Sequence, residues 1–198
     1  PMTSLVPGPV VGVSALAVGV SDFVVLGREH GQLFLSSPLE TEESASGELT
    51  PGELGGADLH ASRSGIACQI AEDEDDAMSI VSELLSFLPD HCLAEPPLVE
   101  TGDDPERLCD VLASIVPDDP NRPYDMVKVI EETVDDGHFV ELFQYYADNI
   151  IVGFSRLEGT TVGIVANQPK VLAGCLDIDA SVKAARFIRT CDCFNIPL

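Results

Sequence analysis

The sequence predicts an α/β fold made of two similar pieces that a proline-rich linker joins. In both pieces, short apolar runs alternate with segments that have a helical period. The pieces span residues 1–88 and 124–198. Between them, residues 89–123 hold seven prolines and many aspartates, a composition typical of a segment that runs over a surface.

The first piece opens with small residues at Pro9–Gly19 that predict a tightly packed helix. Short buried strands are expected at Asp22–Leu26, at Gln32–Ser36 and at Ile66–Ala71. The acidic, glycine-rich stretch Thr41–Gly56 predicts a short helix and a loop.

The clearest helix closes the first piece. Its apolar residues recur at spacings of three and four, so they share one face: Ala77, Ile80, Val81, Leu84, Leu85 and Leu88. The acidic run Glu72–Asp76 lies at its start, where the helix dipole favours negative charge. Pro89 ends the helix.

The second piece follows a short predicted helix between Glu106 and Ile115. Its first elements are a helix at Met126–Val134 and a strand at Phe139–Phe143. The strands Ile150–Leu157 and Thr160–Val165 predict a hairpin, with its turn at Glu158 and Gly159.

A last helix is expected to begin with Asp179 as its cap. Four apolar residues are predicted to face a core: Val182, Ala185, Phe187 and Ile188. Three cations are placed on the opposite side, in solvent: Lys183, Arg186 and Arg189. The chain stops at Phe194–Leu198, which resembles the entry to a buried strand, so we expect an internal fragment that aggregates when isolated.

The charge balance limits the partners. Thirty-four acidic residues face ten basic ones, which gives a formal charge of −24. Nucleic acid and anionic membranes are disfavoured, because both require Lys and Arg. The apolar stretch Val10–Val20 is too short to span a bilayer. The six cysteines show neither a disulfide framework nor zinc spacing, so a cytoplasmic protein with reduced cysteines and no metal site is expected.

No nucleophile–base pair emerges from the residues. The four histidines are scattered, and neither a phosphate loop nor a Gly-x-Ser-x-Gly elbow is present. One arrangement favours chemistry: Pro7–Val13 leads directly into the first helix. Backbone N–H groups at such a start can stabilise an oxyanion without a titratable side chain.

Several ordered motifs carry a family resemblance. The first is Glu53–His60 with Ser64-Gly65, and the second is Arg122–Asp125 followed by Asp135–Gly137. The others are Gly163–Pro169, Ala173–Ile178, Ala184–Phe187 and Cys191–Pro197. Together they resemble the carboxyltransferase (β) subunits of biotin-dependent acyl-CoA carboxylases, of the propionyl-CoA carboxylase and methylmalonyl-CoA carboxyltransferase type, over nearly the whole chain.

The resemblance implies tandem crotonase-like (ClpP/crotonase) domains, each a ββα-superhelix and each incomplete here. It implies carboxyl transfer between carboxybiotin and the α-carbon of a short acyl-CoA, propionyl-CoA or methylmalonyl-CoA, through an oxyanion-stabilised enolate. Biotin would arrive on a partner carrier domain, with a biotin carboxylase as a further partner. The full-length subunit would form a hexameric ring, and this chain alone would be inactive.

The resemblance also assigns site residues. Gly12 and Val13 take the positions of a backbone donor pair, although the family usually has two glycines there. His60, Asn167 and Gln168 match motifs that imply substrate binding, and each is also a residue type that fixes loops and strand ends. Two enzymatic alternatives remain open: the α subunit of a biotin-dependent decarboxylase, and a transcarboxylase. A degenerate, non-catalytic scaffold is the third.

Overall fold

The computed structural model describes residues 1–37, 50–119 and 122–198. Within them, the chain divides into two compact units. Unit 1 consists of Pro1–Leu84 and Phe143–Tyr146, and unit 2 of Leu85–Leu142 and Ala147–Leu198. The described residues of the proline-rich stretch fall within unit 2. Most of the helix and loop predicted for Thr41–Gly56 lies outside the described residues.

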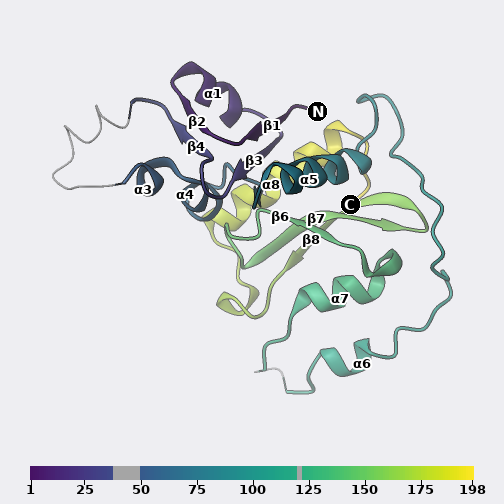
Figure 1. Ribbon diagram of the computed structural model, residues 1–198. Helices are drawn as coiled ribbons and strands as arrows, with labels where there is room; N and C mark the ends of the chain where they lie inside the picture. Colours follow the sequence, from purple (N-terminus) through teal and green to yellow (C-terminus); the bar gives the residue numbers. More distant parts are fainter. Residues whose placement is uncertain (38–49, 120–121) are drawn as a thin grey trace. The chain divides into compact units, whose positions relative to one another are not determined.

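Unit 1 contains two parallel sheets (Figure 1). One has the order β1-β3-β5, with β1 at Thr3–Val6, β3 at Phe23–Gly27 and β5 at Gln69–Ala71. The other pairs β2 (Pro9–Val11) with β4 (Gln32–Phe34). The predicted strands are confirmed, but Pro9–Val11 is strand rather than the start of a helix.

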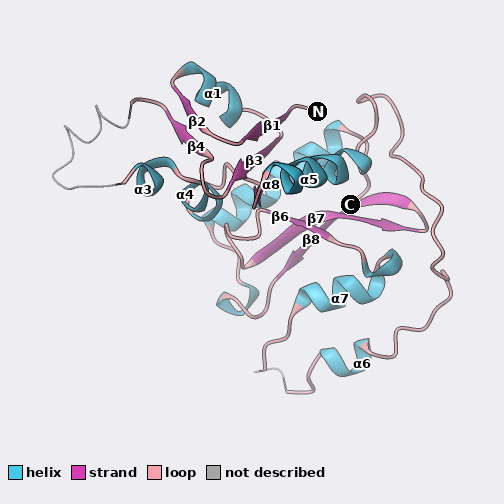
Figure 2. Ribbon diagram, viewed as in Figure 1, coloured by secondary structure: helices cyan, strands magenta, loops and turns pink. Residues whose placement is uncertain are grey.

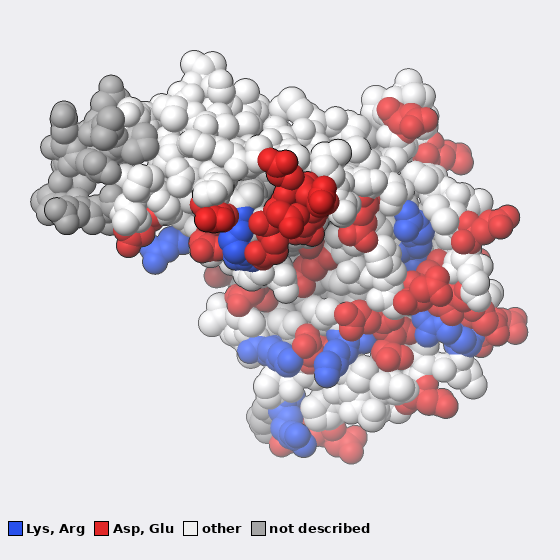
Figure 3. Space-filling model, viewed as in Figure 1, with Lys and Arg blue, Asp and Glu red and all other residues white. Residues whose placement is uncertain are grey.

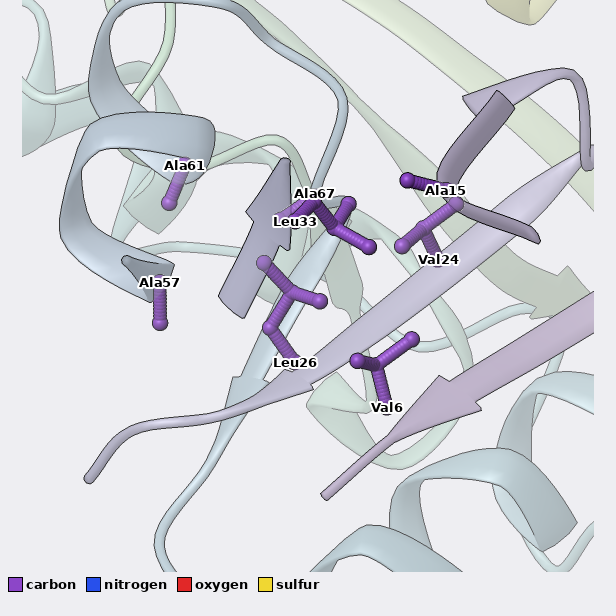
Figure 4. Close-up of a cluster of buried hydrophobic side chains, with 8 residues drawn as sticks. All are labelled: Val6, Ala15, Val24, Leu26, Leu33, Ala57, Ala61 and Ala67. Carbon is purple, nitrogen blue, oxygen red and sulfur yellow. The ribbon is translucent and has the colours of Figure 1, made fainter. Parts of the chain in front are cut away.

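The centre of unit 1 surrounds β3, which is buried along almost its whole length. Burial of both faces explains its continuous apolar sequence, which is typical of parallel strands. Figure 4 shows the cluster that packs there: Val6, Ala15, Val24, Leu26, Leu33, Ala57, Ala61 and Ala67. Its many alanines let helices approach the strands closely.

The helices of unit 1 begin in two ways: α3 (Pro51–Gly55) has a side-chain cap, whereas α1 (Val13–Gly19) and α4 (Ala57–Ser62) follow glycines without one. α1 follows Gly12, and α3 begins with a capping box between Thr50 and Glu53. α4 contributes two of the cluster alanines. These elements bring α1 and α4 to the same core.

α5 (Glu74–Ser86) is the helix that its apolar period predicts. Ala77 and Leu84 are buried, whereas Leu85 is 47% exposed. Glu74, Asp75 and Asp76 form its first turn, and Figure 3 shows acidic side chains gathered over this helix. They are solvated and complement the helix dipole.

Unit 2 is built on an antiparallel sheet with the order β6-β7-β8. β6 spans Val140–Leu142, β7 Ile150–Leu157 and β8 Thr160–Asn167. The turn residues Glu158 and Gly159 have φ of 50° and 75°. Positive φ at both positions is what a two-residue hairpin turn of type I′ requires, so the predicted hairpin is confirmed.

Helices cover both faces of this sheet (Figure 2). On one face, α7 (Met126–Thr133) places Ile130 against Ile151. On the other, α8 (Ile178–Cys193) places Phe187 against Phe154, with 5.1 Å between ring centroids. Residues at odd and even positions of β7 thus serve opposite faces, as the strand period requires.

The predicted faces of the last helix are partly wrong: Phe187 is buried and Arg189 exposed, as expected, but the other core positions and Lys183 differ. α8 begins at Asp177, whose carboxylate accepts the Ala180 N–H at 2.8 Å, rather than at Asp179. Its buried face consists of Ala180, Lys183, Phe187 and Cys191. Val182 and Ile188 are 54% and 40% exposed, and Ala185 is exposed as well. The prediction assigned apolar side chains to the core and charged ones to solvent, but in α8 a lysine occupies one core position.

Hydrogen bonds connect the proline-rich stretch to the rest of unit 2. Arg107 donates to the carbonyls of Glu132 and Val134, both at 2.8 Å, so it caps the end of α7. The Val99 N–H donates to the Gly159 carbonyl at 3.0 Å. This stretch also contains α6 (Leu112–Ile115), inside the predicted range.

Two single-turn 3₁₀ helices complete unit 2: η1 at Asp135–Gly137 and η2 at Leu172–Gly174. All six cysteines are free. Burial raises the pKa of the Cys191 thiol to about 12, so that thiol is inert. In the described part of the chain, every helix is too short or too polar for a bilayer crossing.

Candidate functional site

The junction between β2 and α1 holds the predicted backbone donors. Gly12 is the N-cap of α1, with φ 71° and ψ −135° and no side-chain cap. This conformation strains any residue with a Cβ atom, so glycine sets the turn. Val13 then takes the first helical position, where a backbone N–H has no acceptor inside the helix.

The amides of this junction have different surroundings. The Gly12 N–H donates to the Phe34 carbonyl at 2.8 Å, which extends the pairing of β2 with β4. In this structure the Gly12 N–H is therefore engaged within unit 1, although the resemblance assigns it to a donor pair. That bond leaves the Val13 N–H, at the first helical position, as the remaining candidate donor of the pair.

The surface around the junction is apolar. Val13 is 84% exposed, and Leu16 and Val20 are 57% and 69% exposed, while Ala15 packs into the core. α1 has no charged residue, and Figure 3 shows an uncharged surface over it. An anionic oxygen beside the Val13 N–H would meet no opposing negative charge from α1.

His60 lies on α4 and reaches the strand beside this junction. Its Nε2 is 3.1 Å from the Leu33 carbonyl, and its Nδ1 is 2.9 Å from Ser64 Oγ. A neutral ring that donates from Nε2 and accepts at Nδ1 satisfies both contacts. Leu33 is next to Phe34 on β4, so His60 and Gly12 hold neighbouring carbonyls of one strand.

Gln168 lies just beyond β8 in unit 2 and is 8% exposed. Its Nε2 donates to Asp125 Oδ1 at 2.9 Å, and its Oε1 accepts the Met126 N–H at 3.2 Å. Both ends of the amide are thus used to join β8 to the start of α7.

Asp125 caps α7 and holds this network together. Lys170 Nζ lies 2.7 Å from Asp125 Oδ2, and the Val127 N–H donates to Oδ1 at 3.2 Å. Burial acts to raise the pKa of Asp125, but the hydrogen bonds from Lys170, Gln168 and Val127 hold it below its ordinary value. Asp125 is therefore a carboxylate at neutral pH.

Asn167 is the exposed member of the predicted pair in unit 2. Its side chain lies against Gly174, where a Cβ atom would come within 2.5 Å of Asn167 Nδ2. Gly174 has φ 72°, and the two residues before it, Leu172 and Ala173, have φ of 48° and 53°. Non-glycine residues held at positive φ are costly and often mark functional loops.

Two residues of this region, Asn149 and Lys183, were missed by sequence reasoning. Asn149 is 2% exposed, and its Nδ2 donates to the Cys175 carbonyl at 2.8 Å. Lys183 is 2% exposed, and burial lowers its pKa to about 8 despite the attraction of Glu141. The helical spacing of Ala180, Lys183, Phe187 and Cys191 was the available signal for this buried lysine.

Within each unit, the structure brings the predicted residues together. Gly12, Val13 and His60 surround the end of β4 in unit 1, and Asn167 and Gln168 end β8 in unit 2. Among residues 1–37, 50–119 and 122–198, no three His, Cys, Asp or Glu side chains are grouped as metal ligands would be.

Comparison with protein families identifies one match over the whole chain. The family model described as the carboxyl transferase domain matches residues 1–198. The methylmalonyl-CoA decarboxylase subunit alpha of Veillonella parvula is 46% identical over 198 residues, which are 100% of this chain and 39% of that protein. The propionyl-CoA carboxylase carboxyltransferase subunit of Haloferax mediterranei is 45% identical, with 100% and 38% covered.

Solved structures give the same result. A transcarboxylase 12S structure with methylmalonyl-coenzyme A and methylmalonic acid bound matches with a TM-score of 0.95 and 39% identity, over 100% of this chain and 38% of that one. A single-chain, multi-domain long-chain acyl-CoA carboxylase matches with a TM-score of 0.82 and 27% identity, over 100% and 19%. The expected crotonase-like fold is confirmed. The chain thus spans less than two fifths of each of these solved chains.

Proposed function

Because the chain belongs to the carboxyl transferase domain family, we propose that the protein containing it moves a carboxyl group between carboxybiotin and the α-carbon of a short acyl-CoA. The observation that carries the proposal is the match of the family model to all 198 residues. The backbone junction at Gly12–Val13 supports it, because enolate chemistry requires an oxyanion donor rather than a nucleophile.

In this reaction the bond between the biotin nitrogen and the carboxyl carbon would break, and the α-proton of the acyl-CoA would pass to the biotin left behind. The α-carbon of the resulting enolate would then form the new bond to the carboxyl carbon. In the enolate, negative charge develops on the thioester oxygen. We assign the stabilisation of this charge, within this chain, to the Val13 N–H. A donor of this kind contributes about 3 kcal/mol to the transition state. Carboxybiotin would supply the carboxyl group.

The remaining predicted residues take two kinds of role. We propose that Asn167, which is exposed, contacts a reactant. His60 and Gln168 have both polar ends engaged by protein atoms, so they are proposed to hold the loops that shape the site. Their contribution to substrate binding is then indirect.

Propionyl-CoA and methylmalonyl-CoA are the proposed substrates, because the names of two relatives and of the transcarboxylase structure contain these acyl groups. A biotin carboxylase and a biotin carboxyl carrier subunit are the proposed partners. A hexamer of the full-length subunit is proposed by analogy with the hexamer assembly of transcarboxylase 12S. We place the protein in the cytoplasm.

The test uses the full-length subunit and biotin-dependent decarboxylation of methylmalonyl-CoA. Val13→Pro removes the proposed donor N–H, at a helix position where proline is well tolerated. We expect kcat to fall by about 10²–10³-fold. Val13→Ala is the matched control, because it keeps the N–H and shortens the side chain.

Wild-type turnover with an inactive Val13→Pro and an active Val13→Ala supports the assignment. Equal activity of both variants sinks the role of the Val13 N–H. No turnover by a correctly assembled wild-type subunit favours a non-catalytic scaffold, and that alternative has one observation in its support: the Gly12 N–H is already engaged by Phe34.

The decarboxylase reading is the second candidate. The 46% identity to a methylmalonyl-CoA decarboxylase subunit alpha favours it. A decarboxylase complex shares the chemistry at the α-carbon and differs in its partner subunits. Isolation of the native complex and identification of its other chains separate the two.

A further inference from the structure

Lys183 is a buried cation in a position that sequence patterns assign to an apolar side chain. It is 2% exposed, on the face of α8 that packs against β7. Its Nζ donates to the Ala147 carbonyl at 3.3 Å. A lysine loses considerable solvation at such a site, so specific contacts must compensate its burial.

Two carboxylates face this ammonium from neighbouring segments. Glu141 lies on β6, and Asp148 lies in the turn before β7. Both attract Lys183, although burial outweighs them in setting its pKa. The pKa of Glu141 is raised, chiefly by burial. Lys183 therefore joins α8, β6 and the turn at residues 147–149 through charge as well as through its hydrogen bond.

The turn at residues 147–149 controls both ends of the loop that follows β8. Ala147 has φ 45°, which is strained for a non-glycine residue. The Asn149 carbonyl accepts the Gln168 N–H at 2.9 Å, where the loop begins. Asn149 Nδ2 donates to the Cys175 carbonyl at 2.8 Å, where the loop ends.

Between these attachments, the loop carries its own strain and touches a candidate site residue. Leu172 and Ala173 keep positive φ, and Gly174 lies directly against the Asn167 amide. Strained conformations persist only when surrounding contacts determine them. Lys183 contacts the turn, and the turn contacts the loop. These contacts hold the loop in its strained conformation.

We propose that Lys183 is a positioning residue that holds the turn at residues 147–149, and through it the loop at residues 168–175, so that Asn167 faces its reactant. The proposal rests on the function proposed above, in which Asn167 contacts a reactant. It assigns to Lys183 no contact with the reacting atoms.

The test is a double-mutant cycle in the full-length subunit. Lys183→Met keeps most of the side-chain length and removes the charge, and Asn167→Ala removes the proposed contact. We expect each to raise KM by about tenfold for the same reactant, either biotin or methylmalonyl-CoA. Since both changes act through Asn167, the double variant should stay within about twofold of the worse single variant. Lys128→Met, on an exposed site of α7, is the control.

Multiplying effects in the double variant, or an unchanged KM in Lys183→Met, would overturn the proposal. A purely structural role lowers the active fraction, and hence kcat, without the shared change in KM. If Lys183→Met fails to assemble, Asn149→Ser breaks the next link and should give the same KM shift.

Amide hydrogen exchange tests the link between Lys183 and the loop at residues 168–175 without relying on enzymatic activity. In Lys183→Met, amides of residues 168–175 should exchange faster by about tenfold, while those of α4 in unit 1 keep their wild-type rate. Faster exchange in an enzymatically silent wild-type background refutes the carboxyltransferase function but supports the mechanical link. Unchanged exchange refutes the link whether or not the subunit is active.

Discussion

Gln168 Nε2 donates to Asp125 Oδ1 at 2.9 Å, and this bond joins two motifs that lie 43 residues apart. Gln168→Leu removes it together with the acceptor for the Met126 N–H. We expect a loss of about 1–3 kcal/mol in stability, seen as a lower thermal midpoint. Lys170→Met, whose partly exposed ion pair contributes less than about 1 kcal/mol, is the control.

Acid should weaken the same network. Burial raises the pKa of Asp125, but its hydrogen bonds from Lys170, Gln168 and Val127 hold it below 3.8, its ordinary value. The folded chain therefore binds fewer protons, and this stabilisation is present above pH 3.8 and lost as the pH falls through the folded pKa. Thermal midpoints measured across this acidic range should depend less on pH in Asp125→Asn. Parallel profiles for the two proteins would contradict the expectation.

Gly12→Ala tests the turn that precedes α1. A Cβ atom at Gly12 meets nothing within 4 Å, so any cost comes from the backbone at φ 71°. We expect a loss of about 1–3 kcal/mol in stability and faster amide exchange at the start of α1. Gly8→Ala is the matched control, because its Cβ also meets nothing and its φ lies outside the positive range. Equal midpoints for both variants would show that Gly12 is not strained.

Removal of Lys183 should leave Glu141 and Asp148 without the cation that attracts them. Lys183→Met leaves the half-buried Glu141 without the cation that attracts it and removes the hydrogen bond to the Ala147 carbonyl, so we expect a loss of about 1–3 kcal/mol. The addition of Glu141→Gln removes one uncompensated carboxylate, so the double variant should recover part of that loss. A double variant as unstable as the sum of the singles would show that the two residues are not coupled.

Alkaline pH tests the environment of Lys183. Its pKa of about 8 in the folded chain lies below the ordinary 10.5, so the unfolded chain binds more protons between these values. The contribution of Lys183 to stability therefore rises with pH across that window, by roughly 3 kcal/mol in all. Comparison of wild type with Lys183→Met isolates it. A difference between the two proteins that does not change with pH would contradict a depressed pKa.

The sequence predicts strands and helices well where one face is uniformly apolar. The hairpin of β7 and β8 follows from period and turn residues, and α5 follows from its spacing. α8 shows the limit of that reasoning, because Lys183 occupies a core position while Val182 is exposed. A single buried charge depends on tertiary partners, and periodicity carries no information about them.

The candidate site shows the same division. The junction at Gly12 is visible in the sequence because a glycine-rich turn leads into a helix. The engagement of its N–H by Phe34 depends on the pairing of β2 with β4, which a local pattern does not encode. The sequence pattern did not reveal Asn149 for a related reason: its hydrogen bonds to Gln168 and Cys175 reach residues that are close in space and distant in sequence.

Hydrogen bonds from the proline-rich stretch should keep the chain together after its backbone is cut. Val99 and Arg107 bind the hairpin turn and the end of α7, respectively, on the N-terminal side of α6. Cleavage of the peptide bond between Asp118 and Asp119, which are exposed, would leave the two fragments joined through these hydrogen bonds. A nicked chain should therefore migrate as two bands under denaturing conditions and as one particle under native ones.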